Sequence, residues 1–246
     1  MTARPPARPS GARALEAAAE LGPFFRADTQ PGPDWSSWAA LSADPALLTR
    51  RAAEVRAVLA AGPGSPDVDP AVVASLVHLG LVARLVAPPL GAALLSGVLP
   101  VAPVEQVHVR LAGANPLPLA LGATSAAPVA GPADLAAAFG RCWLTPAVEP
   151  LTVAVRDSWT VSGQVLDGNV TSAVAGALRM TATARPELTR RAAAVLDALL
   201  VSGPLAGTGR RREDGSFMRR SCCLFYRLPG AGTCGDCVLD DRPDPG

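Results

Sequence analysis

The amino-acid sequence predicts a mainly α-helical (α+β) fold with one small β-hairpin. Ala is the most common of the 246 residues and aromatic residues make up only 4% of the chain. This composition favours closely packed helices over a β-sandwich, which needs more Tyr, Phe, Ile and Thr. Helix start signals recur along the chain, and one stretch has the two-residue period of a strand. The length is sufficient for one large domain with a sizeable core.

Helices are predicted from their caps and apolar periodicity. Asp44-Pro45 and Asp69-Pro70 each place an N-cap carboxylate before a Pro at the first helical position. The helix after Asp44 is expected to bury a stripe that includes Val55 and Val58, and the last helix a stripe from Leu188 to Leu199. We expect helices over 45–61, 70–84, 88–95, 132–144, 146–159, 164–183 and 186–202.

The strand signal lies in residues 105–111. Val107, Val109 and Leu111 alternate there with polar residues, as in a half-buried strand. Asn115-Pro116 turns the chain, and residues 117–121 are the expected antiparallel partner. The small hairpin is therefore predicted near residues 105–121.

The charge composition excludes several classes of protein. The 22 basic and 21 acidic residues give a net charge of +1, so we expect no nucleic-acid partner. All basic residues are Arg, which excludes Schiff-base chemistry and the lysine of a P-loop.

The apolar residues raise the question of a membrane span, because the mean hydropathy is +0.27. Residues 71–104 are the most apolar stretch, but charges, Pro and Gly interrupt them before ~20 apolar residues accumulate. They predict buried core helices, and they are also compatible with peripheral attachment to a membrane. Residues 1–13 lack the apolar segment of a signal peptide. We expect a cytoplasmic protein, with the inner face of the cell membrane as an alternative position.

The composition divides the chain into three parts. Residues 1–10, rich in Pro and Arg, are expected to be a disordered leader, and residues 11–204 a helical domain that contains the hairpin. From residue 205 the chain changes to Gly and Arg, then Cys, then an acidic tail, which predicts a separate C-terminal segment over 205–246.

That segment holds four of the five cysteines within sixteen residues, in the order C-C-x10-C-x2-C. They are Cys222, Cys223, Cys234 and Cys237. Disulfides are not expected in a reducing compartment, so the cysteines predict a metal centre. Cys234 and Cys237 form a knuckle that turns both thiols toward one metal, and residues 229–232 can reverse the chain between the two pairs.

The identity of the metal remains open on geometry alone. A zinc site of four cysteines usually has two knuckles, whereas the first pair here is adjacent and its side chains point apart in an extended backbone. A binuclear iron–sulfur cluster contains two irons, so the two adjacent thiols need not converge on one ion. The alternative is a zinc-stabilised helical binding module without redox activity.

Residues 219–227, Gly230, Gly232 and the 234–237 knuckle closely resemble the C-terminal motif of the FhuF-type ferric-siderophore reductases. Residues 165–172 resemble the Gly-Asn helix segment of that family, with Asp167 where an aromatic residue is common. The resemblance implies that the four cysteines ligate one [2Fe–2S] cluster.

The resemblance further implies an oxidoreductase that passes one electron to a ferric siderophore and releases Fe(II). The chain has no dinucleotide fingerprint and no flavin motif, so a separate ferredoxin or reductase must supply electrons. A siderophore-synthesis enzyme is a further alternative, but this chain is too short for one. Arg219, Arg220 and Arg227 flank the cysteines. They are either a positive rim that contacts anionic substrate or donor, or a solvated loop.

Five other residues could carry chemistry. Cys142 and His78 lie in apolar helices and are expected to be core residues. His108 falls on the polar face of its strand, and contact with a ligand or substrate is its alternative role. Trp35 and Trp38 are expected to pack the first helices, with docking of a hydrophobic chelate as the alternative.

Overall fold

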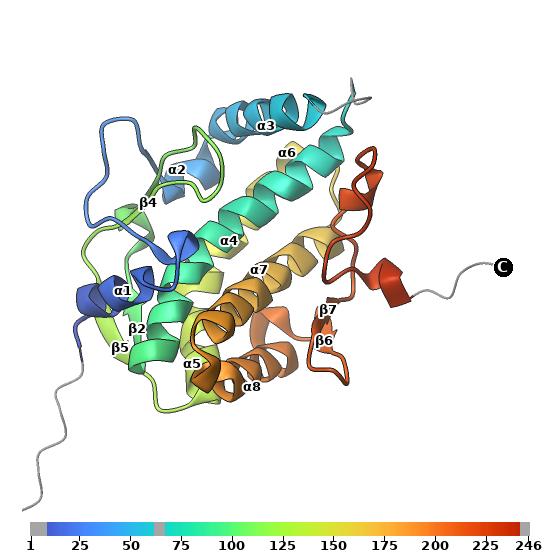
Figure 1. The fold of residues 1–246 in the computed structure, drawn as a ribbon. Coiled ribbons are helices and arrows are strands. Elements are labelled where there is room, and N and C mark those ends of the chain that lie inside the picture. The colour runs from blue at the N-terminus through green and yellow to red at the C-terminus, as the bar shows by residue number, and fades with distance from the viewer. Residues whose placement is uncertain (1–8, 62–66, 242–246) are drawn as a thin grey trace, which may run out of the picture.

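The structure, a computed structural model, describes residues 9–61 and 67–241, so most of the predicted leader lies outside the described residues. Figure 1 confirms the mainly α-helical fold with small sheets. The helices are α1 Gly11–Ala19, α2 Trp38–Ala43, α3 Pro45–Ala60, α4 Pro70–Ser96, α5 Pro132–Phe139, α6 Glu149–Ser158, α7 Gly163–Ala184 and α8 Thr189–Val201. The strands are β1 Ser36–Ser37, β2 Val98–Val101, β3 Val107–Val109, β4 Leu119–Leu121, β5 Ser125–Pro128, β6 Gly209–Arg211 and β7 Phe217–Arg219.

The predicted caps begin their helices as expected. The Asp44 side chain accepts a hydrogen bond from the Ala46 amide, and the Asp69 side chain accepts one from the Ala71 amide, each at 2.9 Å. Each carboxylate satisfies one of the free N–H groups of a first turn. The start of both helices is thus fixed by local sequence.

Helix α4 is one continuous helix, so the predicted break before Pro88 is wrong. Pro88 and Pro89 lie inside it and are buried, as are Leu85 and Leu90. A proline removes one backbone hydrogen bond, and here burial of apolar residues along α4 outweighs that loss. In the described part of the chain α4 is the single helix apolar and long enough to cross a membrane, yet 67% of its most apolar window is buried inside the fold. It serves as the core helix, as residues 71–104 predict.

A second predicted break is also absent. Helices α5 and α6 are joined by a π-helical stretch, Gly140–Val148, that carries Pro146. The wider π turn accommodates a residue that lacks an N–H. Within this stretch Trp143 is fully buried and donates its indole N–H to the Pro100 carbonyl at 2.9 Å.

The predicted hairpin is confirmed. Strands β3 and β4 pair antiparallel with Val107 opposite Leu121, and the inward residues Val107 and Val109 are fully buried. Strand β1 adds to the edge of β3. The pairing of β2 with β5 was not predicted, because neither strand has the alternating pattern that marks a half-buried strand.

The buried face of α3 differs from the prediction. Val58 is 75% exposed, whereas Arg51 is buried. The Arg51 guanidinium donates to the carbonyls of Leu111 and Gly113, which follow β3 and lie outside the strand pairing. Hydrogen bonds to these carbonyls offset the desolvation of the charged group.

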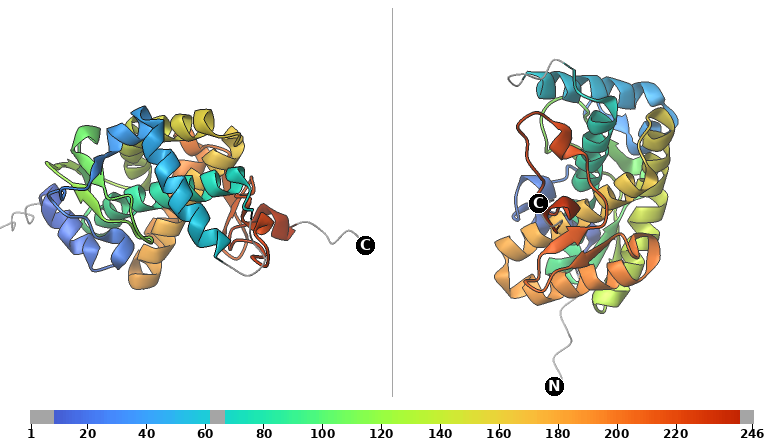
Figure 2. Two further views of the ribbon diagram at one scale, coloured as in Figure 1. Left: turned by 90° about the horizontal axis from the view of Figure 1, so that it is seen from above. Right: turned by 90° about the vertical axis from the view of Figure 1, so that its right-hand side faces the viewer.

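Helices α4 and α7 pack along each other at the centre of the molecule, and α8 packs beside α7 (Figure 1). The small buried residues Ala173 and Ala177 of α7 permit this close approach. The C-terminal segment lies at the end of this pair where α4 and α7 begin, and the turned views in Figure 2 agree. This end of the helical body supports the cysteines.

Candidate metal centre

Strands β6 and β7 lead the chain into the cysteine segment. They pair antiparallel with Gly209 opposite Arg219, and the Arg219 amide continues the ladder by donating to the Asp236 carbonyl at 3.2 Å. The strand pair therefore joins the first cysteines, which follow Arg219, to the knuckle that contains Asp236.

Two local features of the backbone bring the cysteine pairs together. Leu224 has a φ of 67°, a left-handed conformation that is uncommon for a residue with a side chain, and it turns the chain directly after Cys223. Gly230 and Gly232 also have positive φ, at 73° and 66°, and complete the predicted reversal. In the knuckle the Cys237 amide donates to the Cys234 carbonyl at 3.0 Å.

The four thiols lie as two pairs. The Sγ atoms of Cys223 and Cys234 are 3.4 Å apart, and the thiols of Cys222 and Cys237 lie close enough for Cys237 to raise the pKa of Cys222. Across the ranges that the structure describes, no three Cys, His, Asp or Glu side chains gather tightly enough to hold a single metal ion. Two thiol pairs are the donor set that a binuclear cluster requires.

Backbone amides point at three of the four sulfurs. The Leu224 amide donates to Cys222 and the Leu239 amide to Cys237, both at 3.3 Å, and the Phe225 amide donates to Cys223. Each donor lies two residues after its cysteine. Such hydrogen bonds stabilise negative charge on sulfur, as thiolate ligation requires.

The environment changes the thiol pKa values in opposite directions. Burial raises the pKa of Cys222. The hydrogen bond shared with Cys234 lowers the pKa of Cys223 to about 6 and raises the pKa of Cys234, and the Arg219 charge favours the Cys223 thiolate. The positive charge of Arg219 thus acts directly on the cysteine segment.

A buried hydrogen-bond network fixes this segment to the helical body. Arg219 is fully buried and donates to the Asn169 side-chain oxygen at 2.6 Å. The Asn169 amide group donates to the Ser75 carbonyl and hydroxyl at 2.9 and 3.0 Å, and the Ser75 hydroxyl donates to the Cys223 carbonyl at 2.8 Å. The network therefore connects α4, α7 and β7 with a cysteine.

Several buried polar atoms beside the cysteines have no partner among the described residues. They are the Arg219 Nε and Nη1 atoms and the Ser221 hydroxyl. Unpaired buried donors of this kind destabilise a fold unless an acceptor lies nearby, and sulfur atoms of an iron–sulfur cluster accept such hydrogen bonds. The donors and the four thiols fit a [2Fe–2S] cluster held by Cys222, Cys223, Cys234 and Cys237.

Gly168 of α7 allows the segment to approach the helix. A Cβ at this position would lie 2.0 Å from the Ser221 Oγ and 3.3 Å from the Arg219 Nη2. Gly168 thus allows the close approach, and Asn169 supplies the side-chain amide at the centre of the network. These two roles give a physical reason for the Gly-Asn resemblance.

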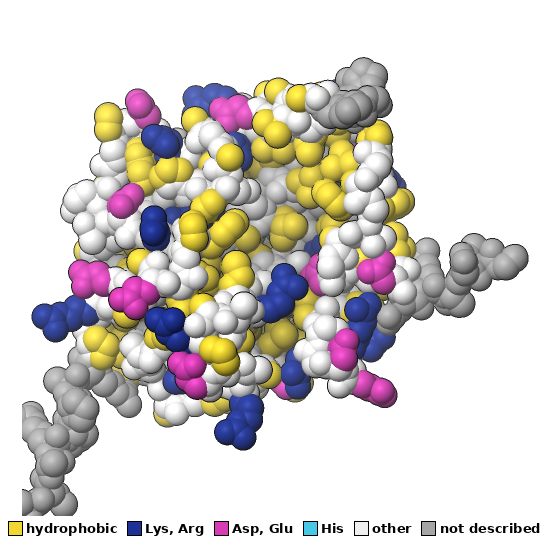
Figure 3. Space-filling model, in the orientation of Figure 1, with side chains coloured by type: hydrophobic (Ala, Val, Ile, Leu, Met, Phe, Trp, Pro, Cys, Tyr) yellow, Lys and Arg dark blue, Asp and Glu magenta, His cyan; other side chains and the backbone are white. Residues whose placement is uncertain are grey.

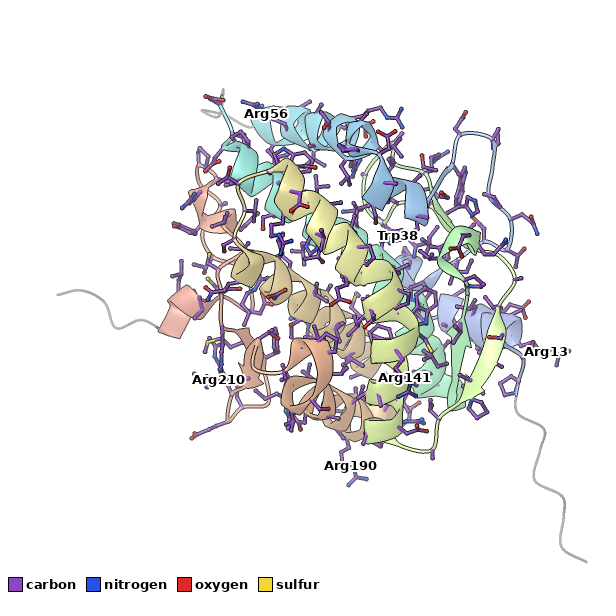
Figure 4. All side chains as sticks on the ribbon, turned by 180° about the vertical axis from the view of Figure 1, so that it is seen from behind. Arg13, Trp38, Arg56, Arg141, Arg190 and Arg210 are labelled. Carbon is purple, nitrogen blue, oxygen red and sulfur yellow. The ribbon has the colours of Figure 1, made fainter. Side chains whose placement is uncertain are left out.

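The three arginines expected to form a rim have different positions. Arg219 is buried, so its assignment to a solvent-exposed rim is wrong, because Asn169 holds its guanidinium inside the fold. Arg220 is exposed. Arg227 is exposed, forms an ion pair with Asp69 at 3.0 Å and lies over the Tyr226 ring at 6.0 Å. Of the other arginines labelled in Figure 4, Arg13, Arg56 and Arg190 lie at separate edges of the molecule.

The remaining candidates lie away from the cysteine segment or in the core. His78 is fully buried, its Nε2 is 3.0 Å from the Thr152 hydroxyl, and burial lowers its pKa to about 3, with a smaller effect of Arg219. Cys142 is half-buried against the core rather than fully buried. Trp38 is fully buried, as expected, and donates to the Ala147 carbonyl at 2.9 Å. His108 is half-buried in β3.

Comparison with known proteins agrees with this geometry. Residues 219–239 match the family model described as the FhuF 2Fe-2S C-terminal domain. A search of the curated proteins finds no match. The matched residues include all four cysteines and Arg219. The cofactor is therefore a [2Fe–2S] cluster, and the zinc alternative loses its support.

Proposed function

Because the chain carries a FhuF-type [2Fe–2S] domain, we propose that it is a ferric-siderophore reductase, an oxidoreductase that transfers one electron to chelated Fe(III). The match of the four-cysteine segment to that domain is the observation that carries the proposal. The half-buried positions of Cys222 and Cys234 support it, since an electron must pass between the centre and an external partner.

The chemistry follows from the difference between the two iron states. Siderophores bind Fe(III) through hard oxygen donors and bind the less charged Fe(II) far more weakly. A [2Fe–2S] cluster, when bound, supplies one electron at a time. The protein holds the thiolates through its backbone amides and places the buried Arg219 charge beside Cys223. That positive charge favours the reduced, more negative state.

The partners and location form part of the proposal. The electron donor is a separate ferredoxin or reductase, and the reaction takes place in the cytoplasm, where Fe(II) is released for use. Peripheral contact with the inner face of the membrane is the alternative position. Arg220 and Arg227, which are both exposed, are the surface residues of the cysteine segment proposed to contact an acidic electron donor.

Anaerobic mixing tests this function. The protein is reduced with dithionite, freed of excess reductant and mixed with a panel of ferric chelates, while a ferrous-specific chelator reports released Fe(II). We expect reoxidation of the cluster and Fe(II) release in equal amounts, and neither in a Cys222→Ala control. Reoxidation without Fe(II) release for every chelate, or no reoxidation at all, would refute the proposal.

A further inference from the structure

A pocket of about 370 Å³ adjoins the cysteine segment. Helices α7 and α8 form its floor, and the β6–β7 hairpin and the knuckle form its walls. Gly235 and Asp236, which lie between the ligands Cys234 and Cys237, are part of its lining. An occupant of this pocket therefore touches the cluster-binding loop itself.

The pocket has the size and lining of a small-molecule site. Its volume lies within the usual range of about 300–1,000 Å³. Much of its floor consists of small or apolar side chains of α7 and α8, among them Ala175, Ala192 and Leu196, and Phe217 closes the hairpin side. Figure 3 shows this face, where hydrophobic side chains reach the surface between basic and acidic ones.

The charges of the lining balance. Arg179 and Arg211 contribute two positive charges, and Asp214 and Asp236 contribute two negative ones. Arg211 is also paired with Asp197 at 2.8 Å, outside the lining. A multiply charged anion would thus meet two carboxylates without a net positive field, whereas a compound of low net charge enters without an electrostatic penalty.

We propose that this pocket binds the apolar part of a ferric chelate of low net charge and holds its iron beside the Cys234–Cys237 knuckle. The inference rests on the proposed function and adds the substrate class and its site. The bound Fe(III) gains one electron, the reduced protein loses one, and an external one-electron donor restores the reduced protein.

Glycines in α7 allow a sharp test. Gly176 lines the pocket, and a Cβ there would meet nothing within 4 Å, so the side chain of Gly176→Leu begins in open space and takes up part of the pocket volume. Gly163, also free of contacts within 4 Å, lies thirteen residues earlier in the same helix and outside the pocket lining. Gly163→Leu is the matched control. If Gly176→Leu loses its cluster, Ala193→Leu on the α8 side provides a second variant with a reduced pocket volume.

Binding is measured by calorimetry with redox-inert gallium(III) complexes, the neutral tris-maltolate and the trianionic tris-catecholate, on cluster-loaded protein. We expect the wild-type protein to bind the neutral complex more tightly. Gly176→Leu is expected to weaken that binding by about tenfold or more, with no change in Gly163→Leu. Asp214→Asn is expected to strengthen binding of the trianionic complex alone. Tighter binding of the trianion by the wild type, or equal affinities in the two Gly variants, would overturn the inference.

Reduction of ferric tris-maltolate separates this inference from the proposed function. Reoxidation of reduced protein that is equally fast in Gly176→Leu and Gly163→Leu contradicts the pocket and leaves the reductase intact. If wild-type protein binds the gallium complex but is not reoxidised by any ferric chelate, the reductase is refuted and the binding data still support the pocket.

Discussion

Gly168→Ala should lower the free energy of unfolding, although Ala is normally preferred to Gly inside a helix. In the interior of a helix this change normally stabilises a protein by about 1 kcal/mol, because Ala has the higher helix propensity. At Gly168 the new Cβ would lie 2.0 Å from the Ser221 Oγ, where ordinary van der Waals contact begins at 3.4 Å. The hydroxyl of Ser221, the residue before Cys222, must move, and the Arg219 Nη2 and Nε atoms, 3.3 and 3.4 Å from the new Cβ, limit the space for that movement.

The size of the stability loss in Gly168→Ala depends on the atoms that the new Cβ meets. Overpacking of a well-packed site costs about 1–3 kcal/mol. A Cβ at Gly176, by contrast, meets nothing within 4 Å, so Gly176→Ala keeps the full helix gain. We expect the free energy of unfolding of Gly168→Ala to lie about 1–3 kcal/mol below that of Gly176→Ala. The cluster should also be lost more readily, since the displaced Ser221 adjoins Cys222 and Cys223.

Ser221→Ala provides the rescue. It removes a buried hydroxyl that has no partner among the described residues, so alone it should change the free energy of unfolding of the cluster-free protein little. With Gly168→Ala it leaves the Arg219 Nη2 at 3.3 Å as the nearest obstacle, and most of the lost stability should return. Denaturant unfolding and the rate of iron loss to a chelator are measured for all variants. Equal stability of Gly168→Ala and Gly176→Ala would refute this account of the close approach.

Three further predictions concern the ligands, the buried charge and the core histidine. Replacing any one of the four C-terminal cysteines by Ala should abolish bound iron and sulfide, whereas Cys142→Ala should retain both; the reverse result would contradict the ligand assignment. Arg219→Gln should lower the reduction potential in a spectroelectrochemical titration more than Arg227→Gln does, because Arg219 is buried and Arg227 is exposed; equal potentials would exclude a tuning role. The pKa of His78 is about 3 in the fold against 6.5 unfolded, so unfolding takes up a proton between these values and stability should fall as pH drops below 6.5, by about 1.4 kcal/mol per pH unit. His78→Gln should reduce that slope, and an unchanged slope in urea titrations would assign the effect to other groups.

The parts of the fold predicted correctly depend on local signals. Asp44 and Asp69 begin their helices because a side-chain acceptor and a following Pro act within one turn. Residues 107–111 show the alternation that burial of one strand face requires. The continuous path of α4 through Pro88 was not predicted, because the packing that stabilises it comes from distant elements. The burial of Arg51 was not predicted for the same reason, since its carbonyl partners lie about sixty residues further along the chain.

In the candidate site, spacing and resemblance indicated the cysteines and the knuckle, and the Gly-Asn segment was identified by resemblance alone. The burial of Arg219 was not predicted, because nothing in the local sequence distinguishes it from the exposed arginines of the same polar segment. Ser75 was missed altogether. Its only signal is that it is a polar residue within an apolar helix, and its partner Asn169 lies 94 residues away in the sequence. Such pairs become visible only when the fold places α4 against α7.

The network of Ser75, Asn169 and Arg219 has a consequence for how this iron–sulfur centre can be transplanted. The matched motif is short, which invites its use as a portable redox tag on other scaffolds. A graft of that motif alone would carry Arg219 without the amide that receives it, and Cys223 without the hydroxyl that holds its carbonyl. A host scaffold must therefore supply two adjacent helices that place a Ser and a Gly-Asn pair side by side. The smallest transferable unit is thus the segment together with the first two turns of α4 and of α7.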